Sequence, residues 1–132
     1  MHVVPITEAP PYQAPGHTQM HMRRLQGLDA GPADSLWIGL SVIAPAGGTT
    51  AAASEVEKFY VCIEGEVEVE AELGGVKQVT RLGPLDSCRI APHESRRLCN
   101  KGAEPARLLL VMQLAPPRQR PQIATNIEHQ ER

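Results

Sequence analysis

The chain has 132 residues, a net charge of −2 and a hydrophobic fraction of 42%, which suits one domain with a packed core. The near-neutral charge and an aromatic content of 3% exclude the basic, base-stacking surface of a nucleic-acid-binding protein. No apolar run approaches the ~20 residues that span a bilayer. The start of the chain has neither the basic nor the apolar region of a signal peptide. Because its three cysteines are then expected to be reduced thiols, we predict a cytoplasmic protein with no membrane partner.

Proline-rich segments at the two ends divide the chain. Residues 1–16 contain four prolines and predict an extended N-terminal arm. Residues 116–132 are polar and proline-rich and predict a C-terminal tail outside the core. The folded domain is therefore expected over residues 17–115.

The first core segment, residues 17–27, fits either a helix or a strand. We favour a strand because its neighbours are strands. In a regular strand His17 and His21 point the same way but lie ~13 Å apart at ~3.3 Å per residue. The next segment, residues 35–45, alternates as a strand does and places four apolar side chains on one face: Leu36, Ile38, Leu40 and Val42.

Residues 58–65 form a short β-branched and aromatic run that ends at a glycine. Alternation places Lys58, Tyr60 and Cys62 on one face of this strand. Residues 66–73 alternate strictly, with glutamates on the solvent side, and Gly74-Gly75 supplies a two-residue hairpin turn. Short strands at this near-regular spacing favour a sandwich or barrel. The remaining predicted strands cover residues 76–82, 87–92, 96–100 and 106–114.

Two stretches together resemble the cupin superfamily. Residues 45–69, PAGGTTAAASEVEKFYVCIEGEVEV, resemble the first cupin motif, in which a Gly-rich turn leads to histidines, a Glu or Gln, and a strand that ends at glycine. Residues 83–102, GPLDSCRIAPHESRRLCNKG, resemble the second motif. The resemblance implies an all-β fold: a single cupin or jelly-roll β-barrel of roughly 8–10 strands, with little helix. It also implies a homodimer, and the N-terminal arm suits a position across the partner.

The chain departs from the family at the metal ligands. The histidine pair falls on Ala52 and Ser54 in one register, or on Ala53 and Glu55 in the other. The Glu or Gln position falls on Lys58, and the second-motif histidine on Arg96. A charged lysine or arginine cannot coordinate a divalent ion, so no cofactor is predicted. The less favoured alternative is a displaced metal held by histidines: His17, His21 or His93.

Lys58 and Arg96 are the residues most able to carry chemistry. Lys58 is either a packed lysine or a group whose pKa is lowered by burial, so that it acts as a base or nucleophile. Arg96 either forms a structural ion pair or grips a carboxylate or phosphate. In the first case Glu55, Glu57 or Glu94 is its partner. Arg97 should point the opposite way, toward solvent.

Three functions follow from these residues. The first is a small-molecule-binding barrel that holds an anionic metabolite near Lys58 and Arg96, with Tyr60, Glu57 and Glu55 around it. The second is a metal-dependent cupin enzyme, such as a dioxygenase, isomerase or decarboxylase, with relocated ligands. The third is a metal-free acid/base enzyme that uses Lys58 or Tyr60. The fold alone cannot choose among them.

Overall fold

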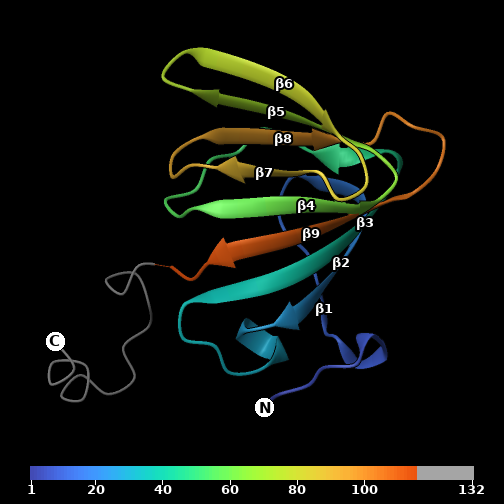
Figure 1. The fold of residues 1–132 in the computed structure, drawn as a ribbon, viewed down its shortest axis with the longest axis vertical. Coiled ribbons are helices and arrows are strands. Elements are labelled where there is room, and N and C mark those ends of the chain that lie inside the picture. Colours follow the sequence, from blue (N-terminus) through green and yellow to red (C-terminus); the bar gives the residue numbers. More distant parts are fainter. Residues whose placement is uncertain (116–132) are drawn as a thin grey trace, which may run out of the picture.

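The structure, a computed structural model, describes residues 1–115, and the predicted tail lies outside this range. The described residues contain nine β-strands and two single-turn 3₁₀ helices but no α-helix (Figure 1). No helix in this range is long and apolar enough to cross a membrane. In chain order the elements are η1 (Ile6–Glu8), β1 (Pro11–Tyr12), β2 (His17–Gln26), η2 (Leu28–Ala30), β3 (Leu36–Thr49), β4 (Lys58–Glu64), β5 (Val67–Leu73), β6 (Val76–Leu82), β7 (Ser87–Ile90), β8 (Ser95–Cys99) and β9 (Ala106–Gln113).

All strand pairs are antiparallel and belong to one curved sheet with the order β6-β5-β8-β3-β9-β4-β7. The strand β2 pairs with β3, and β1 pairs with β2. The sheet curls into a nearly closed barrel, with β6 and β7 as the strands at its two ends (Figure 1). The predicted all-β barrel is confirmed.

The curl depends on β3, which takes part in both layers of the barrel. Its first part pairs with β9, and Gly48, near its end, pairs with Cys99 of β8. A Cβ atom on Gly48 would lie 2.1 Å from the Leu98 carbonyl oxygen, and one on Gly47 would lie 2.6 Å from the Gln19 carbonyl oxygen. Only glycine allows the strands to approach this closely.

The interior of the barrel is filled by apolar side chains from both layers, including Ile43, Val67 and Leu108, each 1% exposed or less. The apolar face predicted for β3 is not the one that is most buried. The side chains of that face are half-buried or exposed on the outside of the sheet, while the inward positions of the same strand are Trp37, Gly39, Ser41 and Ile43. Both faces of β3 are largely apolar, so alternation defines two faces without showing which one faces inward.

The predicted alternation in β4 and β5 is confirmed. Lys58, Tyr60 and Cys62 are buried, whereas Phe59 and Ile63 are about 40% exposed on the other face. In the β5–β6 hairpin the two turn glycines have φ values of 59° and 79°, the left-handed conformation that a two-residue turn requires.

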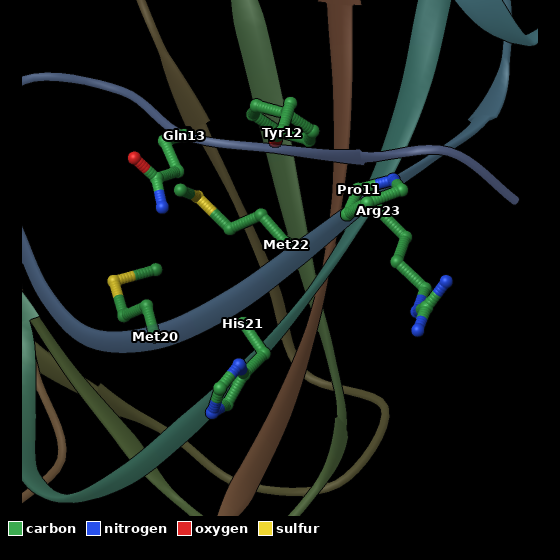
Figure 2. A pocket seen from close by; sticks show the side chains of 7 residues that line it. All are labelled: Pro11, Tyr12, Gln13, Met20, His21, Met22 and Arg23. Carbon is green, nitrogen blue, oxygen red and sulfur yellow. The ribbon is translucent and has the colours of Figure 1, made fainter.

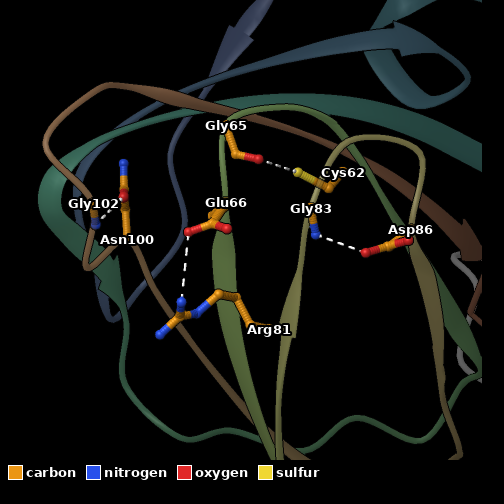
Figure 3. A network of polar contacts seen from close by, with 8 residues as sticks. All are labelled: Cys62, Gly65, Glu66, Arg81, Gly83, Asp86, Asn100 and Gly102. Atoms are coloured by element: carbon orange, nitrogen blue, oxygen red, sulfur yellow. Dashed lines mark hydrogen bonds and ion pairs between the residues drawn. The ribbon is translucent and has the colours of Figure 1, made fainter.

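The end of the barrel near Gly65 is closed by short polar contacts (Figure 3). Asn100, 1% exposed, donates hydrogen bonds from its side-chain amide to the carbonyls of Ile43 and Glu104, each at 2.9 Å. The carboxylate of Asp86 accepts the N–H of Gly83 at 2.9 Å. The first residues of β4 and β8, Lys58 and Ser95, lie at the opposite end.

The N-terminal arm packs on its own barrel. Arg23 donates a hydrogen bond to the Ala9 carbonyl at 2.8 Å, and β1 pairs with β2. The Tyr12 ring meets the Trp37 ring edge-on at 5.6 Å, and the Arg24 guanidinium lies 4.1 Å from the centre of the Tyr12 ring. The arm therefore packs on its own barrel in the single chain, and its predicted position across a partner stays a prediction.

Candidate functional site

The structure brings Lys58, Tyr60 and Arg96 together inside one end of the barrel. Lys58 begins β4, and Tyr60 follows it on the same face. Arg96 enters from β8, held by paired backbone hydrogen bonds with Ala52 at 2.9 and 3.0 Å. The three side chains are 4%, 3% and 7% exposed, in that order. Two formal cations are therefore buried in one small volume.

Arg96 has only neutral partners. Its Nη1 donates to the Thr49 hydroxyl at 2.7 Å and to the Thr50 carbonyl at 3.3 Å. Its Nε is buried and has no hydrogen-bond partner among the described residues. A guanidinium has five N–H donors and a full charge, so both donor capacity and charge remain for another molecule.

Lys58 is also left without a counter-charge: no ion pair or hydrogen bond of its ammonium occurs within residues 1–115. Burial, and next the charge of Arg96, lower the pKa of Lys58 from 10.5 to about 8. Burial raises the pKa of Tyr60, against the opposing charge and hydrogen bonding of Arg96. Tyr60 is therefore a neutral phenol at neutral pH, while Lys58 is close to its titration point.

His17 joins the same cationic end, but His21 does not. Burial lowers the pKa of His17, and the charges of Arg96 and Lys58 lower it further. The prediction that His17 and His21 point the same way is wrong. The β2–β3 register shifts between Thr18 and Met20, where Gln19 has a φ of 52°, and this irregularity reverses the alternation. His21 is exposed on the outer face, and Figure 2 shows it pointing away from Met20.

Two of the three glutamates expected near the cations have partners elsewhere, and the third lines a different hollow. Glu57 pairs with Arg89. Glu55 borders an apolar hollow near Trp37 and Ala115. Glu94 accepts the Ala91 N–H at 2.8 Å. None of the ion pairs within the described range involves Arg96.

The residues at this end do not fit a divalent metal ion. Lys58 and Arg96 occupy two of the positions where the family resemblance expects ligands, and both repel a cation. Within residues 1–115, no group of three His, Cys, Asp or Glu side chains is placed to hold an ion. His93, the third histidine considered, is exposed in the turn before β8 with a φ of 68°.

A pocket of about 240 Å³ opens between the edge strands β6 and β7, and we call it the β6–β7 pocket. Three of its lining residues are the direct cross-strand neighbours of the three site residues: Ile90 faces Lys58, Cys88 faces Tyr60, and Ala71 faces Arg96. The pocket therefore runs along the inner surface that carries the cations. Its other lining residues are Val69, Gln78, Thr80, Arg89 and Glu94.

A larger hollow of about 470 Å³ lies beside β1 and β2 (Figure 2). Tyr12, Gln13, Met20 and Met22 border it on one side of β2, and Arg23 points away from them. Neither Lys58 nor Arg96 lines this hollow or the β6–β7 pocket, but only the β6–β7 pocket contains direct cross-strand neighbours of both. We therefore place the candidate site at the cationic end and not here.

Solved structures with the same fold define its class. A polyketide cyclase, RemF of Streptomyces resistomycificus, superposes with a TM-score of 0.73 at 22% identity, over 89% of this chain and 82% of its own. A sugar phosphate isomerase of the cupin superfamily from Silicibacter pomeroyi gives a TM-score of 0.68 at 18% identity, over 86% and 76%. A cupin superfamily protein from Desulfitobacterium hafniense gives 0.60 at 16%, over 79% and 84%. The fold is that of a small cupin barrel.

A sequence relative adds a second line of evidence. No family model matches the chain. The Mycobacterium tuberculosis protein named Beta-D-galactosidase Rv1717 is 38% identical over 106 residues, which cover 80% of this chain and 88% of that protein. The chain belongs to the same family as this mycobacterial protein, and its fold is that of the cupin barrels.

Sequence reasoning did not identify Thr49, Gln78 or Thr80 as part of this region. Thr49 holds Arg96 through a contact between residues 47 positions apart, which no local pattern reveals. The positions of Gln78 and Thr80 follow from the hairpin register, which pairs them with Ala71 and Val69. The predicted two-residue turn was the available signal, because it fixes that register.

Proposed function

We propose that the protein binds a small anionic molecule at the cationic end of its barrel. The observation that supports this most is the burial of Lys58 and Arg96 together without a carboxylate partner among the described residues. Two like charges in a partly dry interior are costly. An anion between them removes that cost, and the guanidinium fork suits a carboxylate or phosphate.

Thermal unfolding with added inorganic phosphate or acetate tests this proposal. A bound anion should stabilise the wild-type protein by about 2.7 kcal/mol at a hundredfold excess over Kd. Arg96→Ala should abolish the stabilisation, and Arg96→Lys, which keeps the charge but not the fork, should reduce it. The matched control Arg97→Ala, at the exposed neighbouring position, should respond as the wild type does. An unchanged response in Arg96→Ala would contradict the proposal.

A second candidate function is hydrolysis of a β-D-galactoside, which the name of the mycobacterial relative favours. Most glycosidases use two carboxyl groups that flank the scissile bond. Glu94 supplies one carboxyl group to the β6–β7 pocket. Among the described residues, no second carboxyl group lines that pocket. Tyr60 or Lys58 would have to supply the second function from the next strand, where they lie directly across from Cys88 and Ile90.

Release of a chromophore from an aryl β-D-galactoside tests the second candidate. If Glu94 transfers the proton, Glu94→Gln should lower kcat about 100-fold or more. Glu72→Gln, an exposed glutamate on β5, is the matched control and should leave kcat unchanged. Absence of turnover by the wild-type protein would remove this candidate and leave anion binding standing.

A further inference from the structure

The β6–β7 pocket has one wall of unused hydrogen-bonding side chains. Gln78 and Thr80 lie on the inner face of β6, opposite Ala71 and Val69, and both remain exposed. Neither side chain makes a hydrogen bond within the described residues. The amide and the hydroxyl each donate and accept, so this wall can bind a ligand that does both.

The rest of the pocket combines one acid, Glu94, and one cation, Arg89, which is paired with Glu57, with a small apolar surface. One carboxylate oxygen of Glu94 holds the Ala91 N–H at 2.8 Å, and the other has no partner within residues 1–115. Val69, Ala71 and Ile90 supply apolar contacts between Glu94 and the β6 wall. A ring with hydroxyls at its edge and C–H groups on its faces matches this lining, because a few placed polar groups then fix its orientation.

The size of the pocket limits the ligand to about one ring. Its volume of about 240 Å³ falls below the ~300 Å³ at which pockets for drug-sized molecules begin. The pocket also borders the buried cations, since Ile90 and Ala71 lie directly across from Lys58 and Arg96. One ligand in the pocket can therefore place an acidic group toward the cations.

We propose that the ligand is a single sugar ring that carries one acidic group. Its hydroxyls bind Gln78, Thr80 and Glu94, and its carboxylate or phosphate points toward Arg96 and Lys58. This inference rests on the proposed anion site and adds the class of molecule to which the anion belongs.

Calorimetric titration with four probes tests the inference: D-galacturonate, D-galactose, acetate and inorganic phosphate. Galacturonate should bind more tightly than galactose, which lacks the acid, and than acetate, which lacks the hydroxyls. Thr80→Val and Gln78→Leu should each weaken galacturonate binding about three- to tenfold, as expected for the loss of one hydrogen bond. Both variants should leave acetate and phosphate binding unchanged. Thr18→Val, at an exposed position of β2, is the matched control and should bind all probes as the wild type does.

The outcomes separate this inference from the proposed function. If phosphate and acetate bind through Arg96 but galacturonate binds no better than acetate, the sugar inference is wrong and the anion site stands. If galactose binds as well as galacturonate, the acidic group of the sugar is not recognised and the sugar inference is wrong, while phosphate and acetate binding through Arg96 still decides the anion site. Galacturonate affinity that survives Thr80→Val and Gln78→Leu would also overturn the inference. Because both positions are exposed, these variants should keep the wild-type melting temperature in buffer alone.

Discussion

Lys58 places a charge in the barrel interior without a carboxylate to neutralise it among residues 1–115. Its pKa is lowered from 10.5 to about 8, a difference of about 3 kcal/mol at ~1.4 kcal/mol per pKa unit. Below pH 8 the amine is charged in both the folded and unfolded states, and the full cost is present. Between pH 8 and 10.5 the unfolded chain binds more protons at this amine than the folded protein does, so the free energy of unfolding rises with pH. Above that window the amine is neutral in both states.

Lys58→Met should therefore raise the free energy of unfolding at pH 7 by about 3 kcal/mol in anion-free buffer. The gain over the wild type should shrink as pH rises from 8 and disappear near 10.5. Denaturant titrations of both proteins at several pH values measure this difference. Because the other titratable groups are the same in both proteins, their contributions to the pH dependence cancel in the difference. Lys77→Met, on an exposed strand, should show no such window. A Lys58→Met protein that is less stable than the wild type at pH 7 would contradict the prediction.

For single residues, the alternation of side chains along a strand correctly predicted that Lys58 and Tyr60 point inward and that Arg97 points toward solvent. It could not predict that His17 and His21 lie on opposite faces, because the irregularity at Gln19 has no sequence signal at a non-glycine residue. Glu57, the residue before β4, pairs with Arg89 of β7, and the register between β4 and β7 cannot be predicted from local sequence.

Among the elements, β3 connects the two layers of the barrel because of Gly47 and Gly48. Gly48→Ala should lower the free energy of unfolding by about 3 kcal/mol, the upper end for an overpacked site. The reason is that its Cβ would lie 2.1 Å from a backbone oxygen that cannot rotate away. Gly83→Ala is the control: its nearest neighbour would be 3.6 Å away, so the change should stay within ~0.5 kcal/mol. Equal melting temperatures for the two variants would contradict this account.

The strands themselves were largely predictable, since β3 to β9 follow the alternation and turn residues of their segments. The pairing of β1 with β2 was not predicted, because two residues within a proline-rich arm carry no periodicity. The inward face of β3 was not predictable either. Its inward positions include Gly39 and Ser41, which leave room beneath the arm rather than forming an apolar stripe.

At the scale of the whole molecule, one outer face of the barrel is apolar across three neighbouring strands. The cross-strand register lines up Leu40, Leu109 and Val61, and beside them Ile38, Val111 and Phe59. Monomeric proteins rarely expose large contiguous apolar patches. We therefore expect the predicted homodimer to form through this face rather than through the arm.

Sedimentation at micromolar concentration should give twice the chain mass of 14.3 kDa. Phe59→Lys, which puts a charge in the middle of the apolar face, should give the monomer mass. Val76→Lys, at a more exposed position of the β5–β6 hairpin, should remain dimeric. A wild-type monomer, or a dimer that survives Phe59→Lys, would show that this face does not carry the assembly.

The edge-on contact between the arm and Trp37 has a practical consequence. This is the chain's single tryptophan, 9% exposed, with the Arg24 guanidinium 5.1 Å from its ring. Its cross-strand neighbour Met112 is in turn the neighbour of Lys58. Indole emission responds to water and to nearby charge. The intrinsic fluorescence of the unlabelled protein should therefore report, through one residue, both the release of the arm and the arrival of a ligand beside Lys58.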